Sequence, residues 1–180
     1  DAIRQLDINF FGMVRCCRAV LTHMRRSGGG RIVNISSVAG AIPIPFQGYY
    51  SASKAAINSY TSALANEIGP YGVSVCAVQP GDISSGFTDA RAKNIVGDDE
   101  YNGRIERSVK VMEHDERNGM SPDTAGAYIA KIALKSKVKP LYAIGFKYKF
   151  FVFALVFPET LHVTVLSSSS RKFPATSAVY

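Results

Sequence analysis

The chain has 180 residues, 47% of them hydrophobic and 19% charged, and its formal net charge is +7 at pH 7. This hydrophobic fraction excludes an intrinsically disordered chain, and the sequence has neither the glycine period of collagen nor a heptad repeat. The longest uninterrupted apolar run covers residues 150–157. It is far shorter than the roughly 18 residues that a transmembrane segment needs, so none is predicted.

The cysteines, histidines and basic residues indicate no metal site and no nucleic-acid partner. Cys16, Cys17 and Cys76 are too few and too irregularly spaced for a disulfide framework or a zinc site. We expect the adjacent pair to be small core residues of a helix, in a reducing cytoplasmic compartment. The basic residues form no dense run, so the positive charge predicts a solvated surface and no binding of nucleic acid.

Hydrophobic periodicity and Gly/Pro breaks divide the chain into alternating helices and strands. Apolar residues at helical spacing predict helices, and short β-branched runs predict strands buried in a sheet. The expected elements are a helix over 3–24, a strand over 31–36, a helix over 50–69, a strand over 73–79, a helix over 124–134 and a strand over 139–144. Such alternation implies parallel strands with right-handed crossovers, and therefore an α/β fold with a doubly wound parallel sheet.

Two segments stand outside this alternation. Residues 86–120 are polar and charged, and they are interpreted as an excursion from the sheet. Residues 146–180 form a tail that is rich in aromatic side chains at its start. That aromatic start either packs over a pocket or a partner subunit, or makes peripheral contact with a membrane surface. We therefore expect residues 1–145 to hold the chemistry and residues 146–180 to be an appended tail.

Distinctive polar residues follow the two central strands, at the edge where open α/β sheets bind ligands. Ser36 and Ser37 follow the first strand, and a Pro80–Ser85 turn closes the second. Between them, Tyr50 and Lys54 lie one helical turn apart and share a face. A phenol has a pKa of about 10, and a fixed ammonium nearby would lower it, as a carbonyl reductase needs of its acid/base. A serine hydroxyl at the strand end would hold the substrate oxygen beside the phenol.

Three stretches carry a resemblance to a known family. They are Gly30-Arg-Ile-Val-Asn-Ile-Ser-Ser-Val-Ala-Gly40, Tyr50-Ser-Ala-Ser-Lys54 and Gly72-Val-Ser-Val-Cys-Ala-Val-Gln-Pro-Gly81. In this order and spacing they resemble the classical short-chain dehydrogenase/reductase family, continuously from about residue 3 to 90 and more loosely to about 150. The resemblance implies a Rossmann-like fold whose N-terminal, glycine-rich cofactor half is absent, so we expect the chain, which starts at Asp1, to be the truncated catalytic part.

The family's catalytic residues carry over position by position. Tyr50 matches the acid/base, and Lys54 matches the lysine that lowers its pKa and binds the nicotinamide ribose. Ser37, which lies 13 residues before Tyr50, matches the substrate-orienting serine better than Ser36 does. Asn9 matches the helix asparagine that supports a water relay to the lysine. The resemblance thus predicts Asn9, Ser37, Tyr50 and Lys54 as the catalytic set.

The resemblance also implies a nicotinamide cofactor, NAD or NADP. Besides Tyr50 and Lys54, the expected cofactor-binding residues are those of the turn that packs beside the nicotinamide: Pro80, Gly81, Ile83 and Ser85, the last where the family usually has Thr. The run 28–30 precedes a strand and does not follow one, so it is interpreted as a linker and not as a phosphate cradle. The choice between NAD and NADP is normally set in the absent half.

The implied activity is hydride transfer between an alcohol and a ketone, on a hydrophobic, steroid- or lipid-like substrate. Residues 86–120 resemble the family's substrate lid, where four apolar side chains either line a pocket or simply pack: Phe87, Ile95, Val109 and Met112. A homo-oligomer is expected for the complete protein, paired through helices 1–25 and 50–69. The alternative is a non-catalytic α/β fragment or scaffold that keeps the site residues but binds no cofactor.

Overall fold

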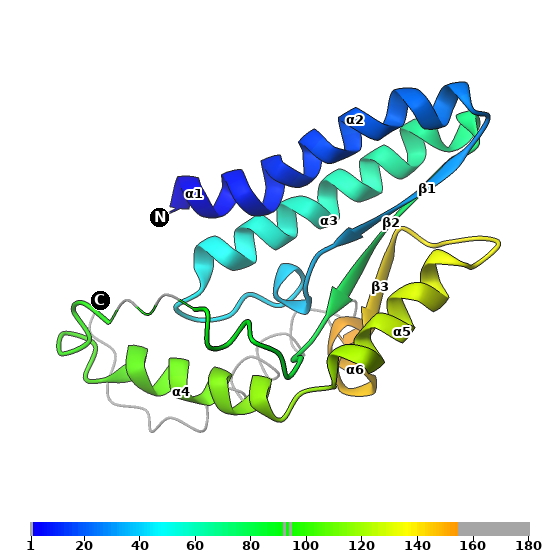
Figure 1. Cartoon of the computed structure of the whole chain (residues 1–180). Coiled ribbons are helices and arrows are strands. Elements are labelled where there is room, and N and C mark those ends of the chain that lie inside the picture. Colours follow the sequence, from blue (N-terminus) through cyan, green and yellow to red (C-terminus); the bar gives the residue numbers. More distant parts are fainter. Residues whose placement is uncertain (1, 92, 94, 155–180) are drawn as a thin grey trace.

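A three-stranded parallel sheet forms the centre of the computed structural model, which describes residues 2–91, 93 and 95–154 (Figure 1). Its strands are β1 (Gly30–Ile35), β2 (Val73–Pro80) and β3 (Leu141–Ile144), adjacent in that order. Both pairings are parallel, and the register places Val33 opposite Cys76 and Val78 opposite Tyr142. The predicted parallel α/β sheet is confirmed.

Helices cover both faces of this sheet, as a doubly wound fold requires. Alternate residues of β2 point to opposite faces, so Val73 and Val75 join one core while Cys76 and Val78 join the other. Helices α2 (Gly12–Arg26) and α3 (Gly48–Ile68) pack side by side over the first core, and α5 (Pro122–Ala133) covers the second (Figure 1). This double burial explains why β2 reads as a nearly continuous apolar run.

The first helical stretch is interrupted near its start. Helix α1 (Ala2–Leu6) continues through a π-helical turn, η1 (Asp7–Phe11), into α2. The Gly12 N–H donates to the Asp7 carbonyl, five residues back, so one extra residue is accommodated in the turn. The helix predicted over 3–24 is therefore present, but hydrophobic periodicity did not reveal the interruption.

The adjacent cysteines differ in their surroundings, and the expectation that both are core residues is half wrong. Cys17 is buried against the sheet, whereas Cys16 is exposed. Successive residues of a helix are about 100° apart, so a single layer of sheet cannot cover both.

The glycine run at 28–30 lies at the amino-terminal edge of the sheet, away from the strand ends that bind ligands. The Gly30 N–H donates to the Gly72 carbonyl, and a Cβ on Gly72 would lie 2.7 Å from the Gly28 oxygen. Gly72 also has a positive φ of 74°, which favours glycine. The run thus joins α2 to β1 through a close backbone contact with the turn before β2, consistent with a linker.

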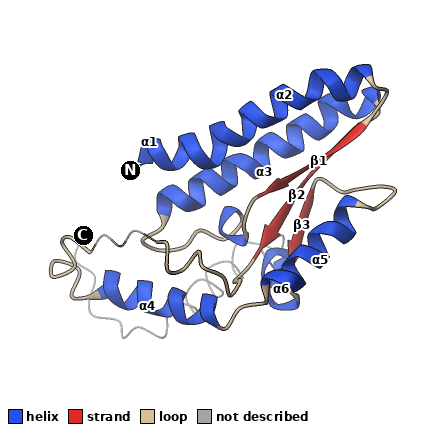
Figure 2. Cartoon of the chain, in the orientation of Figure 1, coloured by secondary structure: helices blue, strands red, loops and turns tan. Residues whose placement is uncertain are grey.

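Among the described residues between β2 and α5, helix α4 (Arg104–Arg117) lies beyond the carboxyl ends of the strands. Loop joins β2 to α4, as Figure 2 shows. The 3-10 turns η2 (Val38–Gly40) and η3 (Gly69–Tyr71) flank α3 in the chain, and α6 (Phe146–Ala154) follows β3. The predicted tail from residue 155 onward falls outside the described residues. None of the helices in the described part is long and apolar enough to cross a membrane.

Candidate active site

The predicted site residues lie at the carboxyl edge of β1 and β2, where α3 begins. The loop through Pro43 and Pro45 returns the chain from β1 to the start of α3. Ser51 holds this return in place, because its Oγ accepts a hydrogen bond from the Ile44 N–H at 3.1 Å. The first turns of α3, which carry Tyr50 and Lys54, are thereby positioned beside the ends of both strands.

The two serines after β1 have different partners. Ser36 is buried and donates from its Oγ to the Lys54 carbonyl at 3.0 Å. Ser37 is half-buried; its Oγ accepts from the Ala39 N–H at 3.1 Å and lies 3.5 Å from the Pro80 carbonyl. Ser37 also acts on the Tyr50 side chain, since it lowers the pKa of that phenol. Ser36 therefore links β1 to α3, whereas Ser37 lies beside the end of β2, and its role as the substrate-orienting serine stays a prediction.

Tyr50 and Lys54 are adjacent, but their electrostatics differ from expectation. The Lys54 Nζ lies 5.6 Å from the centroid of the Tyr50 ring and donates to the Ile35 carbonyl at 3.1 Å. Burial raises the pKa of Tyr50 above its ordinary value, and the hydrogen bond with Ser37 offsets only part of that rise. Burial also lowers the pKa of Lys54. The net shift of the Tyr50 pKa is thus upward, and the expected lowering by Lys54 stays a prediction.

Asn9 is connected to the site through the side chain of Ser53. It lies in the π-helical turn η1, and its Nδ2 donates to the Ser53 Oγ at 3.1 Å. Ser53 in turn donates to the Tyr50 carbonyl at 2.7 Å. Asn9 is thus connected to the helical turn that carries Tyr50 and Lys54. The water relay from Asn9 to Lys54 stays a prediction.

The Pro80–Ser85 turn is packed beneath the ring of Tyr148, a residue of α6 that sequence reasoning missed. A Cβ on Gly81 would lie 2.0 Å from Tyr148 Cε2, so only glycine fits there. The Asp82 N–H donates to the Tyr148 hydroxyl at 3.2 Å, and that hydroxyl donates to the Asp82 carboxylate. Burial, reinforced by Asp82, raises the pKa of Tyr148, which keeps this hydroxyl a donor.

The other predicted cofactor residues of this turn occupy different environments. Ile83 forms a parallel bridge to Met120 and packs against the second core. Ser85 is exposed, and its Oγ accepts from the Phe87 N–H at 3.4 Å. Pro80 borders a predicted catalytic side chain, since its carbonyl lies 3.5 Å from the Ser37 Oγ.

Replacing Gly81 by Ala is expected to lower the free energy of unfolding by about 1–3 kcal/mol, because the new methyl group would overlap the Tyr148 ring. Thermal or denaturant unfolding measures the change. Gly86→Ala is the matched control, since a Cβ on Gly86 meets nothing within 4 Å. Equal stability of the two variants would show that Tyr148 does not cover Gly81.

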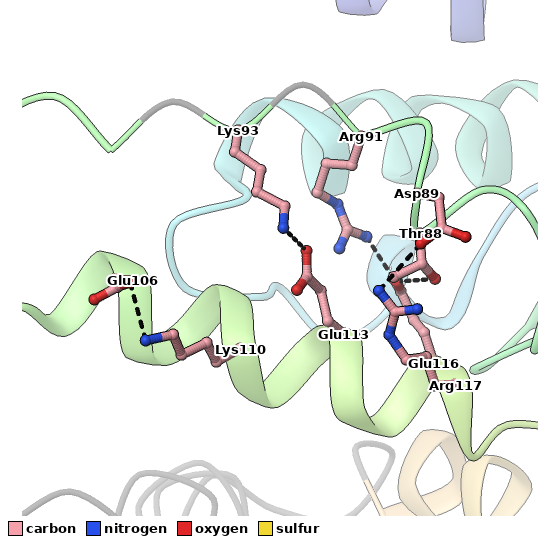
Figure 3. A network of polar contacts seen from close by, with 9 residues as sticks. All are labelled: Thr88, Asp89, Arg91, Lys93, Glu106, Lys110, Glu113, Glu116 and Arg117. Atoms are coloured by element: carbon pink, nitrogen blue, oxygen red, sulfur yellow. Dashed lines mark hydrogen bonds and ion pairs between the residues drawn. The ribbon is translucent and has the colours of Figure 1, made fainter.

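A polar network joins the segment after this turn to α4 (Figure 3). Thr88 is 2% exposed and donates to Glu116 Oε2 at 2.7 Å, and Arg91 Nη2 pairs with Glu116 Oε1. Two flanking ion pairs join the same segments, Arg117–Asp89 at 3.1 Å and Lys93–Glu113 at 2.6 Å. Within the 86–120 segment that was interpreted as a lid, side chains therefore hold the part that precedes α4 against α4.

This network affects the candidate acid/base. The negative charge of Glu116 raises the pKa of Tyr50 and the positive charge of Arg91 lowers it, which places both near the phenol. Sequence reasoning named neither residue, since no motif marks them. Of the four apolar side chains expected in the lid, Phe87 and Ile95 are exposed, and Val109 and Met112 are half-buried.

Sequence comparisons show clear relatives. A family model described as short chain dehydrogenase matches residues 1–95. The 3-ketodihydrosphingosine reductase of Bacteroides thetaiotaomicron is 46% identical over 150 residues, which are 79% of this chain and 56% of that protein. The dehydrogenase/reductase SDR family member 7B of Xenopus laevis is 30% identical over 167 residues, 93% of this chain and 48% of that protein. The chain spans about half the length of these curated relatives.

Solved structures show the same fold. A short-chain dehydrogenase from Streptomyces avermitilis superposes with a TM-score of 0.68 at 26% identity, covering 94% of this chain and 61% of that one. A short chain dehydrogenase from Burkholderia cenocepacia, solved in complex with NADP, gives a TM-score of 0.67 at 21% identity, covering 92% of this chain and 59% of that one. The described sheet and helices therefore correspond to part of a larger α/β domain in each case.

Proposed function

Since this chain belongs to the short chain dehydrogenase family, we propose that it is the catalytic part of an oxidoreductase that transfers hydride between NAD or NADP and an alcohol or ketone carbon. The observation that carries the proposal is the junction of Ser37, Tyr50 and Lys54 at the carboxyl edge of the sheet. The Lys54 Nζ lies 5.6 Å from the centroid of the Tyr50 ring, and the Ser37 Oγ lies 3.5 Å from the Pro80 carbonyl at the end of β2, which supports the proposal.

The donors at this edge fit a nicotinamide nucleotide. Among the described residues, Lys54 Nζ donates one hydrogen bond, to Ile35, and an ammonium has three N–H groups. Two donors are left for the ribose hydroxyls, and Tyr50 precedes Lys54 by one helical turn. The nicotinamide ring would lie beside the turn residues Pro80, Gly81, Ile83 and Ser85. The cofactor would supply the hydride, and the residues of this chain would supply the proton.

In the reductive direction Tyr50 would donate its phenolic proton to the carbonyl oxygen of the substrate. Ser37 would donate a hydrogen bond to the same oxygen as negative charge develops on it. Because burial raises the pKa of Tyr50, the phenol holds its proton at neutral pH and is suited to act as the acid. Lys54 and Asn9 would then return a proton to Tyr50.

We propose a hydrophobic, lipid-like substrate. The name of the Bacteroides relative, 3-ketodihydrosphingosine reductase, supports a long-chain ketone. Exposed apolar side chains on the loops around the site also favour a hydrophobic substrate. The ring of Phe46, in the loop before α3, meets that of Tyr101 edge to face at 6.0 Å, and Phe87 and Ile95 are also exposed. These side chains would contact an alkyl chain as it leaves the site.

Two further proposals concern the division of the chain into parts and its assembly into an oligomer. Residues 1–145 would form the catalytic part and residues 146–180 an appended tail, although Tyr148 of that tail already contacts Gly81. The complete protein would be a homo-oligomer paired through α2 and α3. The exposed side chains of Ile8 and Phe11, on the stretch that leads into α2, support such pairing.

The proposal predicts different pH profiles for the two directions of the reaction. Ketone reduction by the full-length protein should stay level between about pH 6 and 9, because the raised pKa keeps Tyr50 protonated there. Alcohol oxidation needs the phenolate, so its rate should climb by up to about tenfold per pH unit over the same range. Steady-state assays with NADPH and NADP⁺ measure both profiles.

A reductive rate that falls through neutral pH would contradict this assignment of Tyr50. Absence of ketone-dependent turnover at every pH, with no change in NADH or NADPH fluorescence on titration, would favour the non-catalytic scaffold.

A further inference from the structure

The ring of Tyr148 lies at the carboxyl ends of two neighbouring strands, where α6 begins (Figure 1). Gly81 directly follows β2, and Gly145 directly follows β3. A Cβ on Gly81 would lie 2.0 Å from one carbon of this ring, and a Cβ on Gly145 would lie 2.9 Å from another. A larger residue at either position would displace the ring, so the two glycines leave the space that the phenol fills.

The hydroxyl of Tyr148 is bound twice to one residue of the turn after β2. It accepts a hydrogen bond from the Asp82 N–H at 3.2 Å and donates one to the Asp82 carboxylate. A hydrogen bond to a charged group is stronger than one between neutral groups. The backbone and the side chain of Asp82 are therefore fixed by the same phenol.

Other contacts hold the turn through different atoms. The Asp82 carbonyl accepts a hydrogen bond from the Met120 N–H at 3.0 Å, and the Ser84 N–H donates to the Met120 carbonyl at 2.9 Å. Neither contact engages the Asp82 N–H or the Asp82 carboxylate, which Tyr148 binds. Removing the Tyr148 hydroxyl should therefore loosen the start of the turn and leave its attachment to Met120 in place.

We propose that Tyr148 is a positioning residue of the cofactor site, whose hydroxyl holds the Pro80–Ser85 turn in the conformation that receives the nicotinamide ring. This inference rests on the proposed function, in which that ring lies beside the turn. The apparent affinity for a ligand falls with the fraction of protein in the binding-competent conformation, so a turn that is already held in place binds the ring more tightly. The start of the segment expected to be an appended tail, 146–180, thereby becomes part of the site.

The test compares each dinucleotide with the same molecule lacking the nicotinamide ring. Calorimetry on the full-length protein measures the dissociation constants of NADH and ADP-ribose, and of NADPH and ADP-ribose 2′-phosphate. Tyr148→Phe keeps the ring beside Gly81 but has no hydroxyl for Asp82. It should weaken the binding of NADH and NADPH by about 10-fold, as expected for the loss of a hydrogen bond to a charged group, and leave the binding of the two ring-free compounds unchanged.

Tyr128→Phe is the matched control on the neighbouring helix α5. Tyr128 is 41% exposed, and the Nζ of Lys149, a residue of α6, lies 5.8 Å from the centroid of its ring. The loss of its hydroxyl should leave the binding of all four compounds as in the wild-type protein. Thermal unfolding checks that both variants fold.

Variants of Asp82 test whether the two side chains act as one unit. Asp82→Asn keeps an oxygen that accepts from the Tyr148 hydroxyl, so it should retain most of the affinity for the ring. Asp82→Ala should lose about as much as Tyr148→Phe. The double variant Asp82→Ala/Tyr148→Phe should lose less than the product of the two single losses, because both changes remove the same hydrogen bond.

Amide hydrogen exchange in the absence of cofactor measures the hold on the turn directly. The Asp82 amide should exchange about 10-fold faster in Tyr148→Phe, because it loses its acceptor, while the amides of β2 keep the wild-type rate. Equal acceleration of both would mean that Tyr148 stabilises the fold as a whole, and would overturn the positioning role.

The binding outcomes separate this inference from the proposed function. Unchanged affinities in Tyr148→Phe, or an equal loss for the ring-free compounds, overturn the role of Tyr148; tighter binding of the dinucleotides also overturns it, because Tyr148 would then obstruct the ring. A selective loss of ring affinity in a protein that transfers no hydride supports Tyr148 and contradicts the oxidoreductase proposal. Hydride transfer with unchanged affinities in Tyr148→Phe does the reverse, and a wild-type protein that binds neither dinucleotide contradicts both.

Discussion

Tyr50→Phe in the full-length protein is expected to lower kcat for ketone reduction by about 10²–10⁴-fold, because phenylalanine has no proton to donate to the substrate oxygen. The structure of α3 should persist, since Ser53 donates to the backbone carbonyl of residue 50 and not to its side chain. NADPH oxidation in the presence of a long-chain ketone measures the loss.

Tyr49→Phe is the matched control for this prediction. Tyr49 is the preceding residue and is 64% exposed, so its hydroxyl should be dispensable. Near-normal turnover in Tyr50→Phe, or an equal loss in both variants, would remove Tyr50 from the mechanism.

Ser37→Ala and Ser36→Ala are expected to separate catalysis from stability. Ser37→Ala should lower kcat by about 10²-fold with little change in Tm, because this hydroxyl would stabilise the developing oxyanion. Ser36→Ala should lower the free energy of unfolding by about 0.5–1.5 kcal/mol, because it removes a buried hydrogen bond to the Lys54 carbonyl. Steady-state kinetics and thermal unfolding of both variants give the comparison.

The reverse pattern, with the larger kinetic loss in Ser36→Ala, would mean that the two serines exchange roles when substrate binds. Large stability losses in both variants would mean that Ser37 is a structural residue whose hydrogen bonds to Ala39 and Pro80 hold the strand end.

Much of the fold could be predicted because its signals are local. The apolar run of β2 is buried on both faces, and Pro70, Gly72 and Gly81 mark the boundaries of neighbouring elements. Helix α4 was not predicted, because its residues belong to the charged segment 86–120, which was interpreted as an excursion from the sheet. Ile105, Val109 and Met112 recur there at helical spacing, so the sequence did contain a signal for it.

The site was only partly predictable, because several of its contacts join residues far apart in the chain. Motif spacing distinguished Ser37 from Ser36, and the two residues do have different hydrogen-bond partners, but the catalytic role of Ser37 stays a prediction. No spacing rule predicts that Tyr148 covers Gly81 or that the charge of Arg91 acts on Tyr50, since both depend on how α4 and α6 pack.

The direction of the Tyr50 pKa shift also could not be predicted from the sequence. The proximity of Lys54 follows from helical spacing, but the burial of the phenol and the binding of the ammonium by the Ile35 carbonyl do not. A charged neighbour lowers the pKa of a phenol only when it acts on the hydroxyl more strongly than burial does.

Transfer of deuterium from NADPH labelled at C4 of the nicotinamide to the carbonyl carbon of a long-chain ketone tests the central claim most directly. The account predicts that the full-length protein forms the alcohol deuterated at that carbon, and that Tyr50→Phe binds NADPH with similar affinity yet transfers deuterium at least about 10²-fold more slowly. Absence of label in the alcohol, or an equal transfer rate in Tyr50→Phe, would contradict the assignment of this edge of the sheet as the catalytic site.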